Sequence, residues 1–325
     1  MKHTRLVAIL IIALALFAVG CSGPEEKKMK FYNKGKELLE KGDYVKASLE
    51  FRNALQIDPK FPDAYYMLGL VELRKGEVRK AYGAFAKTVE LDPKHYDAQI
   101  QMGNLLFMGK QIDQAMEKAE LVLKDNPTHE NALLLKGGVF LARKELDKTT
   151  EIMKGMLERG STKPEVYQQL ASVYQIKRDP RQAEQTLLTG IEKNPQSVPL
   201  HLSLARLYSQ TNELEKADAA YQKLIELDKE NALKYRTALA NLYWAKDDKD
   251  KAQAILNDIV AKEPGKAENW LMVSRFYVAK KDLDQAQRFL KDGLSHNQKS
   301  FELRLALSEL YLNTEKADDA LALLQ

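Results

Sequence analysis

Five histidines and one cysteine are the residues of this chain best suited to metal binding or nucleophilic catalysis. A zinc site needs such residues at short, regular spacings, for example two histidines one helical turn apart. The histidines here lie far apart, and none stands at a ligand spacing from another or from the cysteine: His3, His95, His129, His201 and His296. We therefore expect surface or loop histidines, and we predict no metal, no cofactor and no enzymatic activity.

One segment, Gly103 to Lys110, reads GNLLFMGK and is superficially similar to a phosphate-binding loop. It has five rather than four residues between its glycines, lacks the following Ser or Thr, and lies in a stretch with a helical pattern. The chain contains no GxSxG elbow or kinase signature either. Its many acidic residues alternate with Lys, which is typical of solvated helix faces.

The single cysteine, Cys21, follows a segment with the pattern of a secretory signal peptide. Two basic residues precede fourteen apolar ones, and the small residue Gly20 comes next. The apolar run is shorter than the roughly 20 residues that span a bilayer, which disfavours a permanent transmembrane anchor. We predict that residues 1–20 are a signal peptide.

The sequence Ala18-Val19-Gly20-Cys21 resembles the lipobox of bacterial lipoproteins, with Ala18 where Leu is usual. The resemblance implies cleavage before Cys21, a diacylglycerol on its sulfur, an acyl chain on the new amino terminus, and a lipidated tether over residues 21–27. Several acyl chains hold a protein on a membrane almost irreversibly. Ser22 is not the Asp that favours retention in the inner membrane, so the resemblance implies the periplasmic face of the outer membrane of a Gram-negative bacterium.

The amino-acid composition and net charge limit the fold class and the kinds of partner. Ala, Leu, Lys, Glu and Gln dominate, with only 16 Gly and 10 Pro, which predicts an all-α protein. The formal net charge of +4 becomes 4 − 2 = +2 once Lys2 and Arg5 leave with the signal peptide. No block of one sign forms a basic footprint for phosphate backbones, so we expect no nucleic-acid partner.

The chain repeats itself every 34 residues. Segments start at residues 28, 62, 96, 130, 164 and 198 and, after one inserted residue, at 233, 267 and 301, the ninth being incomplete at 325. Position eight is always Gly, Ala or Ser, and position twenty is Ala in all segments but one. Small residues at these positions let two helices cross closely, and proline at position thirty-two of five segments ends the second helix. Each segment is therefore predicted to be a helix–turn–helix.

The residues Tyr65, Leu68, Gly69, Gly76, Ala81, Phe85 and Pro93 resemble the tetratricopeptide repeat consensus. The resemblance covers residues 28–325 and implies a right-handed α-solenoid of about nine repeats. Ser161, Lys229 and Gln298 replace the proline in three segments, and the residue inserted near Asn231 is expected to alter the superhelical pitch. Because solenoid ends need polar caps, we expect that the chain is a fragment of a longer protein or that its end docks on a partner.

In this family the first helix of each repeat, helix A, lines a concave face, and positions two, five, nine, twelve and thirteen point into it. Repeats two to four place a mostly apolar set there: Tyr66, Leu70, Leu73, Ile100, Asn104, Phe107, Met108, Leu134 and Leu141. Later repeats place a more polar set there: Gln168, Ser172, Gln175, Arg206, Asn241, Trp244 and Arg275. The apolar set is either a partner site or packing between A helices, and the polar set could bind an extended peptide or a glycan.

The family's clamp for chaperone tails needs Lys and Asn side chains at set positions of three repeats. The first three repeats place other residues there: Tyr32, Lys36, Met67, Asp97 and Gln101. We predict instead a membrane-anchored scaffold that binds protein partners in the bacterial envelope. The resemblance is to tetratricopeptide lipoproteins of exosortase and exopolysaccharide export systems, the PrsT-like group of PEP-CTERM systems. The alternatives are outer-membrane protein insertion, pilus assembly, and polysaccharide binding.

Overall fold

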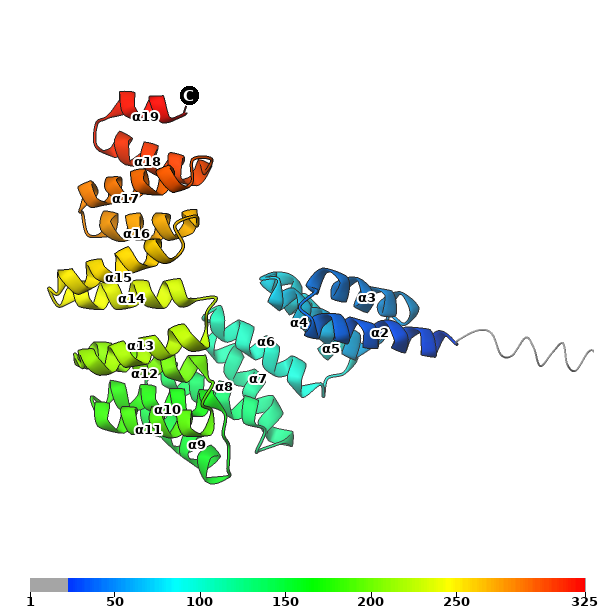
Figure 1. Cartoon of the computed structure of the whole chain (residues 1–325). Helices are drawn as coiled ribbons and strands as arrows, with labels where there is room; N and C mark the ends of the chain where they lie inside the picture. The colour runs from blue at the N-terminus through cyan, green and yellow to red at the C-terminus, as the bar shows by residue number, and fades with distance from the viewer. Residues whose placement is uncertain (1–22, 325) are drawn as a thin grey trace, which may run out of the picture. The chain divides into compact units, whose positions relative to one another are not determined.

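The computed structural model describes residues 23–324, so the predicted signal peptide and the lipidation site Cys21 lie outside the described residues. Within that range the chain forms eighteen α-helices and no strand, arranged in chain order as helix–turn–helix pairs (Figure 1). The predicted all-α class is confirmed. No helix in this range is both long and apolar enough to cross a bilayer.

The first helix of each pair, helix A, is in turn α2 (Pro24–Glu40), α4 (Pro62–Arg74), α6 (Tyr96–Met108), α8 (Glu130–Ala142), α10 (Pro164–Ile176), α12 (Val198–Thr211), α14 (Ala232–Ala245), α16 (Ala267–Ala279) and α18 (Phe301–Asn313). The second, helix B, is α3 (Tyr44–Ile57), α5 (Val78–Leu91), α7 (Ile112–Asp125), α9 (Leu146–Glu158), α11 (Pro180–Lys193), α13 (Leu214–Leu227), α15 (Lys249–Lys262), α17 (Leu283–His296) and α19 (Ala317–Leu324). Seven A helices begin at the predicted residue.

Helix α2 is longer than the repeat predicts. It begins at Pro24, whose fixed φ suits the first helical position, and its first turn carries Glu25 and Glu26, whose charges favour a helix N-terminus. Residues 24–27, predicted to belong to the lipidated tether, are helical and form the first turn of α2. Only Ser22 and Gly23 separate the predicted lipidation site from α2.

The pairs belong to two compact units, Met1–Met156 and Leu157–Gln325, called here the N-terminal and C-terminal units. The core of the C-terminal unit is one continuous cluster that runs from Tyr167 in α10 to Ala320 in α19. The N-terminal unit has separate clusters, among them one around Phe51 and one around Phe85. Each repeat thus buries its apolar face against its neighbours, as expected for stacked repeats.

The small residues at positions eight and twenty lie where helix A crosses helix B. A Cβ atom added to Gly69 would lie 2.4 Å from Cε1 of Phe85, and one added to Gly35 would lie 2.7 Å from the same atom of Phe51. Ala81 at position twenty has no exposed surface. The glycine therefore gives the phenylalanine ring of helix B the space in which it is buried.

The turn between helix A and helix B needs a left-handed backbone in every repeat. The residue at position fifteen has a φ of 60° to 77°: Gly42, Gly76, Lys110, Lys144, Arg178, Asn212, Asp247, Lys281 and Glu315. Only the first two are glycines, the residue that adopts this region without strain. The following N–H closes the turn onto helix A, as when the N–H of Glu77 donates to the carbonyl of Glu72 at 2.8 Å.

Side chains at position four join consecutive repeats. The side chains of Gln99 and Trp270 donate to the carbonyls of Pro93 and Pro264, at 3.2 and 2.8 Å. These carbonyls follow the end of helix B of the preceding repeat and have no partner within it. Their capture fixes the starts of α6 and α16 against the repeats before them.

Buried tyrosines at position eleven form a second set of links in the C-terminal unit. The hydroxyl of Tyr208 donates to Glu184 at 2.8 Å, and that of Tyr243 donates to Asp218 at 2.6 Å. Burial, and then the bond to Glu184, raises the pKa of Tyr208 to about 12. Burial and the bond to Asp218 raise the pKa of Tyr243 as well.

Replacing Gly69 by Ala tests the close crossing. We expect the free energy of unfolding to fall by about 1–3 kcal/mol, because the new methyl group overlaps the buried Phe85 ring. Gly83→Ala is the matched control, since its Cβ has nothing within 4 Å and a helical Ala is favoured by roughly 0.5–1 kcal/mol. Thermal unfolding followed by circular dichroism should move in opposite directions for the two variants. A Gly69→Ala protein as stable as the wild type would contradict this packing.

The tyrosine links predict a stability loss in alkali. The folded state holds the Tyr208 proton up to about pH 12, whereas the unfolded chain releases it above about pH 10, so stability should fall between these values. Tyr208→Phe lacks this linkage. Between about pH 10 and pH 12 we expect the free energy of unfolding of this variant to fall by roughly 1–2 kcal/mol less than that of the wild type. Urea unfolding at each pH would measure both. Parallel losses would show that the hydroxyl is not held in this way.

Candidate functional site

The A helices of consecutive repeats lie against one another, for example α6 with α8, α10 with α12, and α14 with α16. The outward faces of these packed A helices therefore continue from one repeat to the next. We call these faces the A-helix surface. The side chains on it decide what a partner would meet.

In the N-terminal unit most of the predicted apolar set is occupied by packing. Ile100 is only 2% exposed and belongs to the core, so its prediction as a surface residue is wrong. Tyr66, Leu70 and Leu73 are half-buried against the cluster around Phe85. Burial of these side chains favours the interpretation that they hold repeats together.

Four more residues of that predicted set vary in exposure. Phe107 is half-buried against the core cluster of Ile100, and Leu134 is half-buried as well. Asn104 is exposed, and Met108 is the most accessible of the set at 72%. These last two are the side chains that a partner of α6 would reach.

Tyr66 shows how such a residue is held. Its ring lies 4.6 Å from the imidazole of His95 and 5.8 Å from the ring of Phe85, between centroids. Burial, followed by the nearby charge of Asp97, raises the pKa of its hydroxyl. The side chain thus bridges α4 and the start of the next repeat.

The C-terminal unit presents a regular polar row at position nine. Arg206, Asn241 and Arg275 come from three consecutive A helices, and all three are exposed. Neither arginine forms a hydrogen bond or ion pair with another residue of the described range. The amide nitrogen of Asn241 donates to the Thr237 carbonyl at 3.1 Å, and its amide oxygen accepts no hydrogen bond from another described residue. The row combines two available guanidinium groups with one amide acceptor.

Other residues of the predicted polar set are engaged within the protein. Gln168 donates to the Pro199 carbonyl at 3.1 Å and to the Ser203 hydroxyl at 2.9 Å, which links α10 to α12. The indole of Trp244 lies edge-on to Phe276 and Tyr277, with centroids 5.5 and 6.0 Å away. Trp244 is therefore largely a packing residue between repeats seven and eight.

A hollow of about 350 Å³ lies among α14, α15 and α16, beside the inserted residue. It is lined by Lys229, Glu230, Ala232, Leu233, Arg236, Ile259, Lys262, Glu263, Lys266, Glu268 and Asn269. Much of its charge is paired at its rim: Lys266 lies 2.5 Å from Glu263, and Lys262 lies 2.7 Å from Asp258. The inserted residue was the only sequence signal for this hollow.

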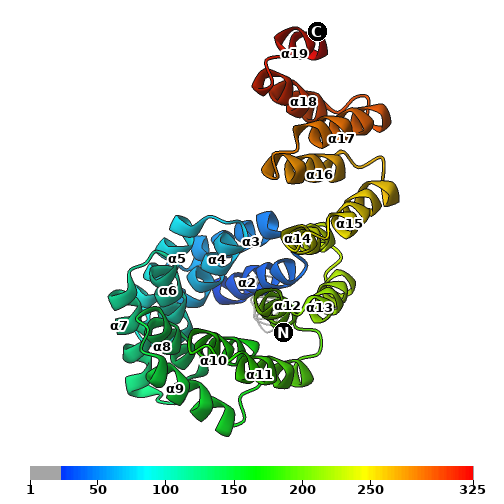
Figure 2. The ribbon, with the colours of Figure 1, turned by 90° about the vertical axis from the view of Figure 1, so that its left-hand side faces the viewer.

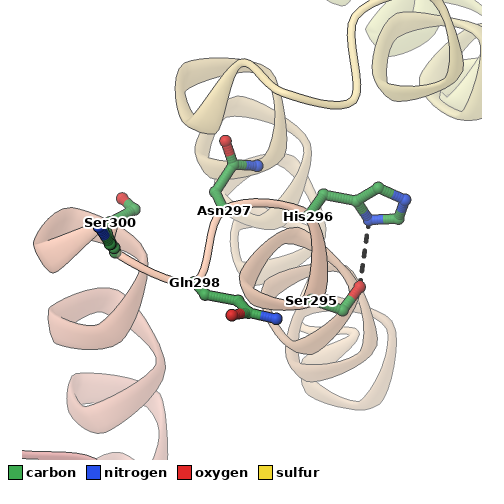
Figure 3. A pocket seen from close by; sticks show the side chains of 6 residues that line it. Ser295, His296, Asn297, Gln298 and Ser300 are labelled. Atoms are coloured by element: carbon green, nitrogen blue, oxygen red, sulfur yellow. Dashed lines mark hydrogen bonds between the residues drawn. The ribbon is translucent and has the colours of Figure 1, made fainter.

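A second hollow, of about 420 Å³, lies on the turn between α17 and α18 (Figure 3). Ser295 Oγ lies 3.1 Å from Nδ1 of His296, a spacing that a nucleophile and its base would have. Both groups also bond the Asp292 carbonyl, at 2.6 and 2.9 Å, and the imidazole stacks on Trp270. These contacts are those of a helix C-terminus whose last carbonyls are being satisfied.

The remaining histidines also have structural partners. Nδ1 of His95 accepts from the N–H of Ala98 at 3.2 Å, and His129 caps α8 in the same way. His201 is 8% exposed, which corrects the expectation of a surface residue, and its Nε2 lies 3.0 Å from the Pro195 carbonyl. His3 lies outside the described residues. In the described range no three His, Cys, Asp or Glu residues gather as metal ligands would.

Comparisons with known proteins agree with this architecture. Family models of the tetratricopeptide repeat match residues 35–76, 63–95, 176–242 and 277–325. No curated protein matches the sequence significantly. The chain is therefore built from tetratricopeptide repeats, and its fold is that of a protein–protein interaction scaffold.

Solved structures share the fold at low identity. PilF of Pseudomonas aeruginosa is 22% identical, with a TM-score of 0.52 over 68% of this chain and 100% of that one. A human IFIT1 dimer with m7Gppp-AAAA is 16% identical, with a TM-score of 0.63 over 93% of this chain and 71% of that one. The Cut9–Hcn1 hetero-tetramer of APC/C is 16% identical, with a TM-score of 0.53 over 89% of this chain and 57% of that one.

The packing of Trp244 predicts that Trp244→Ala lowers stability. Loss of the edge-on contacts to Phe276 and Tyr277 should cost about 2–4 kcal/mol in the C-terminal unit. Asn241→Ala, three residues earlier on the exposed face, should change stability by less than about 0.5 kcal/mol. Urea unfolding followed by tyrosine fluorescence would measure both. Equal stabilities for the two variants would show that Trp244 is a surface residue.

Proposed function

We propose that the protein is a lipid-anchored scaffold on the periplasmic face of the outer membrane, where it holds an acidic, extended segment of a partner protein. The observation that carries the proposal is the position-nine row of Arg206, Asn241 and Arg275. Guanidinium groups bind carboxylates through paired, charge-assisted hydrogen bonds. Two of them that form no hydrogen bond or ion pair with another described residue favour an acidic ligand.

The spacing of the row fits such a ligand. Neighbouring packed helices lie roughly 8–10 Å apart, and α14 packs against α16, so Asn241 and Arg275 are separated by about that distance. An extended peptide covers it with about three residues. The Asn241 oxygen, from the repeat between those of the two arginines, can accept a backbone N–H of the same segment.

The finer cellular role rests on sequence resemblance. A lipobox followed by many repeats resembles the lipoproteins of exosortase systems, and assembly of an exopolysaccharide or protein export machine is the role that we favour. Pilus assembly and outer-membrane protein insertion are the alternatives. One structure with a similar fold is a human IFIT1 dimer with m7Gppp-AAAA, but the near-neutral charge of this chain disfavours an RNA ligand.

Charge reversal tests the partner site. The double variant Arg206→Glu, Arg275→Glu should lose at least tenfold in partner capture from solubilised envelopes, because each charge-assisted bond contributes roughly 1.5–3 kcal/mol. The control Arg181→Glu, Lys193→Glu reverses two exposed charges on helix B of repeat five. Equal capture by the row variant and the control would reject the site. Saturable binding of exported polysaccharide, lost in the row variant, would favour the glycan-binding alternative.

Replacing Cys21 by Ser tests the anchor separately. The wild type should fractionate with membranes as a cleaved chain whose intact mass includes the acyl groups. We expect the variant to keep its signal peptide and to lack that added mass. A variant that is still cleaved before residue 21 and still membrane-bound would show that the anchor is not a lipidated cysteine.

A further inference from the structure

Helix α3 of the first repeat has an outer face unlike that of any other helix B. Val45, at position eighteen, is 76% exposed, and Leu49, one turn later, is 57% exposed. The other eight repeats carry an exposed charge at position eighteen: Arg79, Asp113, Asp147, Arg181, Glu215, Asp250, Asp284 and Asp318. The two apolar residues thus occupy a face that the rest of the chain keeps charged.

Basic side chains surround this apolar pair. Lys41, in the turn before α3, is exposed, and Lys46 and Arg52 have side chains 71% and 58% exposed, while Lys46 pairs with Asp43 at 2.8 Å and Arg52 with Glu72 at 3.4 Å. The one acidic residue of α3, Glu50, is buried and pairs with Lys34 of α2 at 2.6 Å. The outer face of α3 is therefore apolar, with exposed basic side chains beside it.

The same bias extends to the next helix B. Together α3 and α5 contain five basic and two acidic residues. The other seven B helices contain thirteen basic and eighteen acidic residues. Helix α5 also exposes Val78 and Tyr82, at 46% and 36%. Figure 2 shows α3 and α5 at the outer edge of the N-terminal unit, with α2 and α4 on its inner side.

We propose that this face of α3 is a second membrane contact, made with the anionic lipid surface that the acyl chains on Cys21 enter. An apolar pair flanked by cations is the pattern of helices that lie in the headgroup region of a bilayer. This inference rests on the proposed lipid anchor. Val45 and Leu49 enter the boundary between headgroups and acyl chains, while Lys41, Lys46 and Arg52 meet lipid phosphates.

The chain geometry supports this contact. Cys21 is three residues from Pro24, which limits the distance between them to about 11 Å. Helix α2 then runs for 17 residues, or about 25 Å, and α3 packs against it in the opposite direction. The α2–α3 hairpin begins close to the bilayer. When its helices are parallel to the membrane plane, α3 contacts the lipid surface. The two contacts together set the orientation of the first repeat.

The test uses the lipidated protein in vesicles, with a polarity-sensitive fluorophore on a cysteine introduced by Val45→Cys. The matched control is Asp250→Cys, at position eighteen of repeat seven. With phosphatidylglycerol vesicles, we expect a blue shift at residue 45 and at least twofold quenching by spin-labelled acyl chains. Residue 250 should show neither, and Leu49→Asp should abolish both at residue 45 while the helical circular dichroism is unchanged.

The possible outcomes test the membrane contact of α3 and the lipid anchor on Cys21 separately. If Cys21 is lipidated and residue 45 behaves like residue 250, the second contact is refuted while the anchor stands. If the mass spectrum shows the fluorophore on Cys21 as well, that thiol is free, and both the anchor and this inference fail. An equal shift with phosphatidylcholine vesicles would refute the part assigned to the basic side chains.

Discussion

The close crossing of helix A and helix B is the constraint on which the rest of the structure depends. At Gly69 the backbone of helix A leaves no room for even one Cβ beside Phe85. The aromatic ring of helix B is thereby buried, and the two helices act as one unit with a fixed outer surface. Ala at position twenty supplies the corresponding space on helix B. A repeat with bulk at either place could not stack on its neighbours in the same way.

The links between repeats build on that crossing. Carbonyls at the end of helix B receive side chains from position four of the next repeat, as Pro264 receives Trp270. In the C-terminal unit the buried Tyr208 and Tyr243 add bonds to acidic residues of the preceding repeat. The side chains of Gln99, Trp270, Tyr208 and Tyr243 are used in this way rather than offered to a ligand. The exposed row of Arg206, Asn241 and Arg275 stands out because it is not needed for packing.

The sequence predicts the repeat well and the surface less well. Periodic Gly, Ala and Pro locate seven of the nine A helices to the residue, because these residue types act through local sterics that a sequence displays directly. The burial of Ile100 and the packing of Trp244 depend on the neighbouring repeat, and position in a consensus does not reveal them. Proline followed by two glutamates indicates a helix start at Pro24, but the 34-residue repeat places the start at residue 28. The exposure of Val45 emerges only when the nine repeats are compared at one position.

Site-specific photo-crosslinking in living cells tests the central claim most directly, because it captures whichever protein lies against the labelled residue. A photoreactive phenylalanine at Asn241 would lie within the position-nine row, and one at Ala254 would lie on the exposed face of helix B in the same repeat. A protein adduct from residue 241 and none from residue 254 is the result that we predict. Adducts from residue 254 alone would contradict the assignment of partner binding to the A-helix surface.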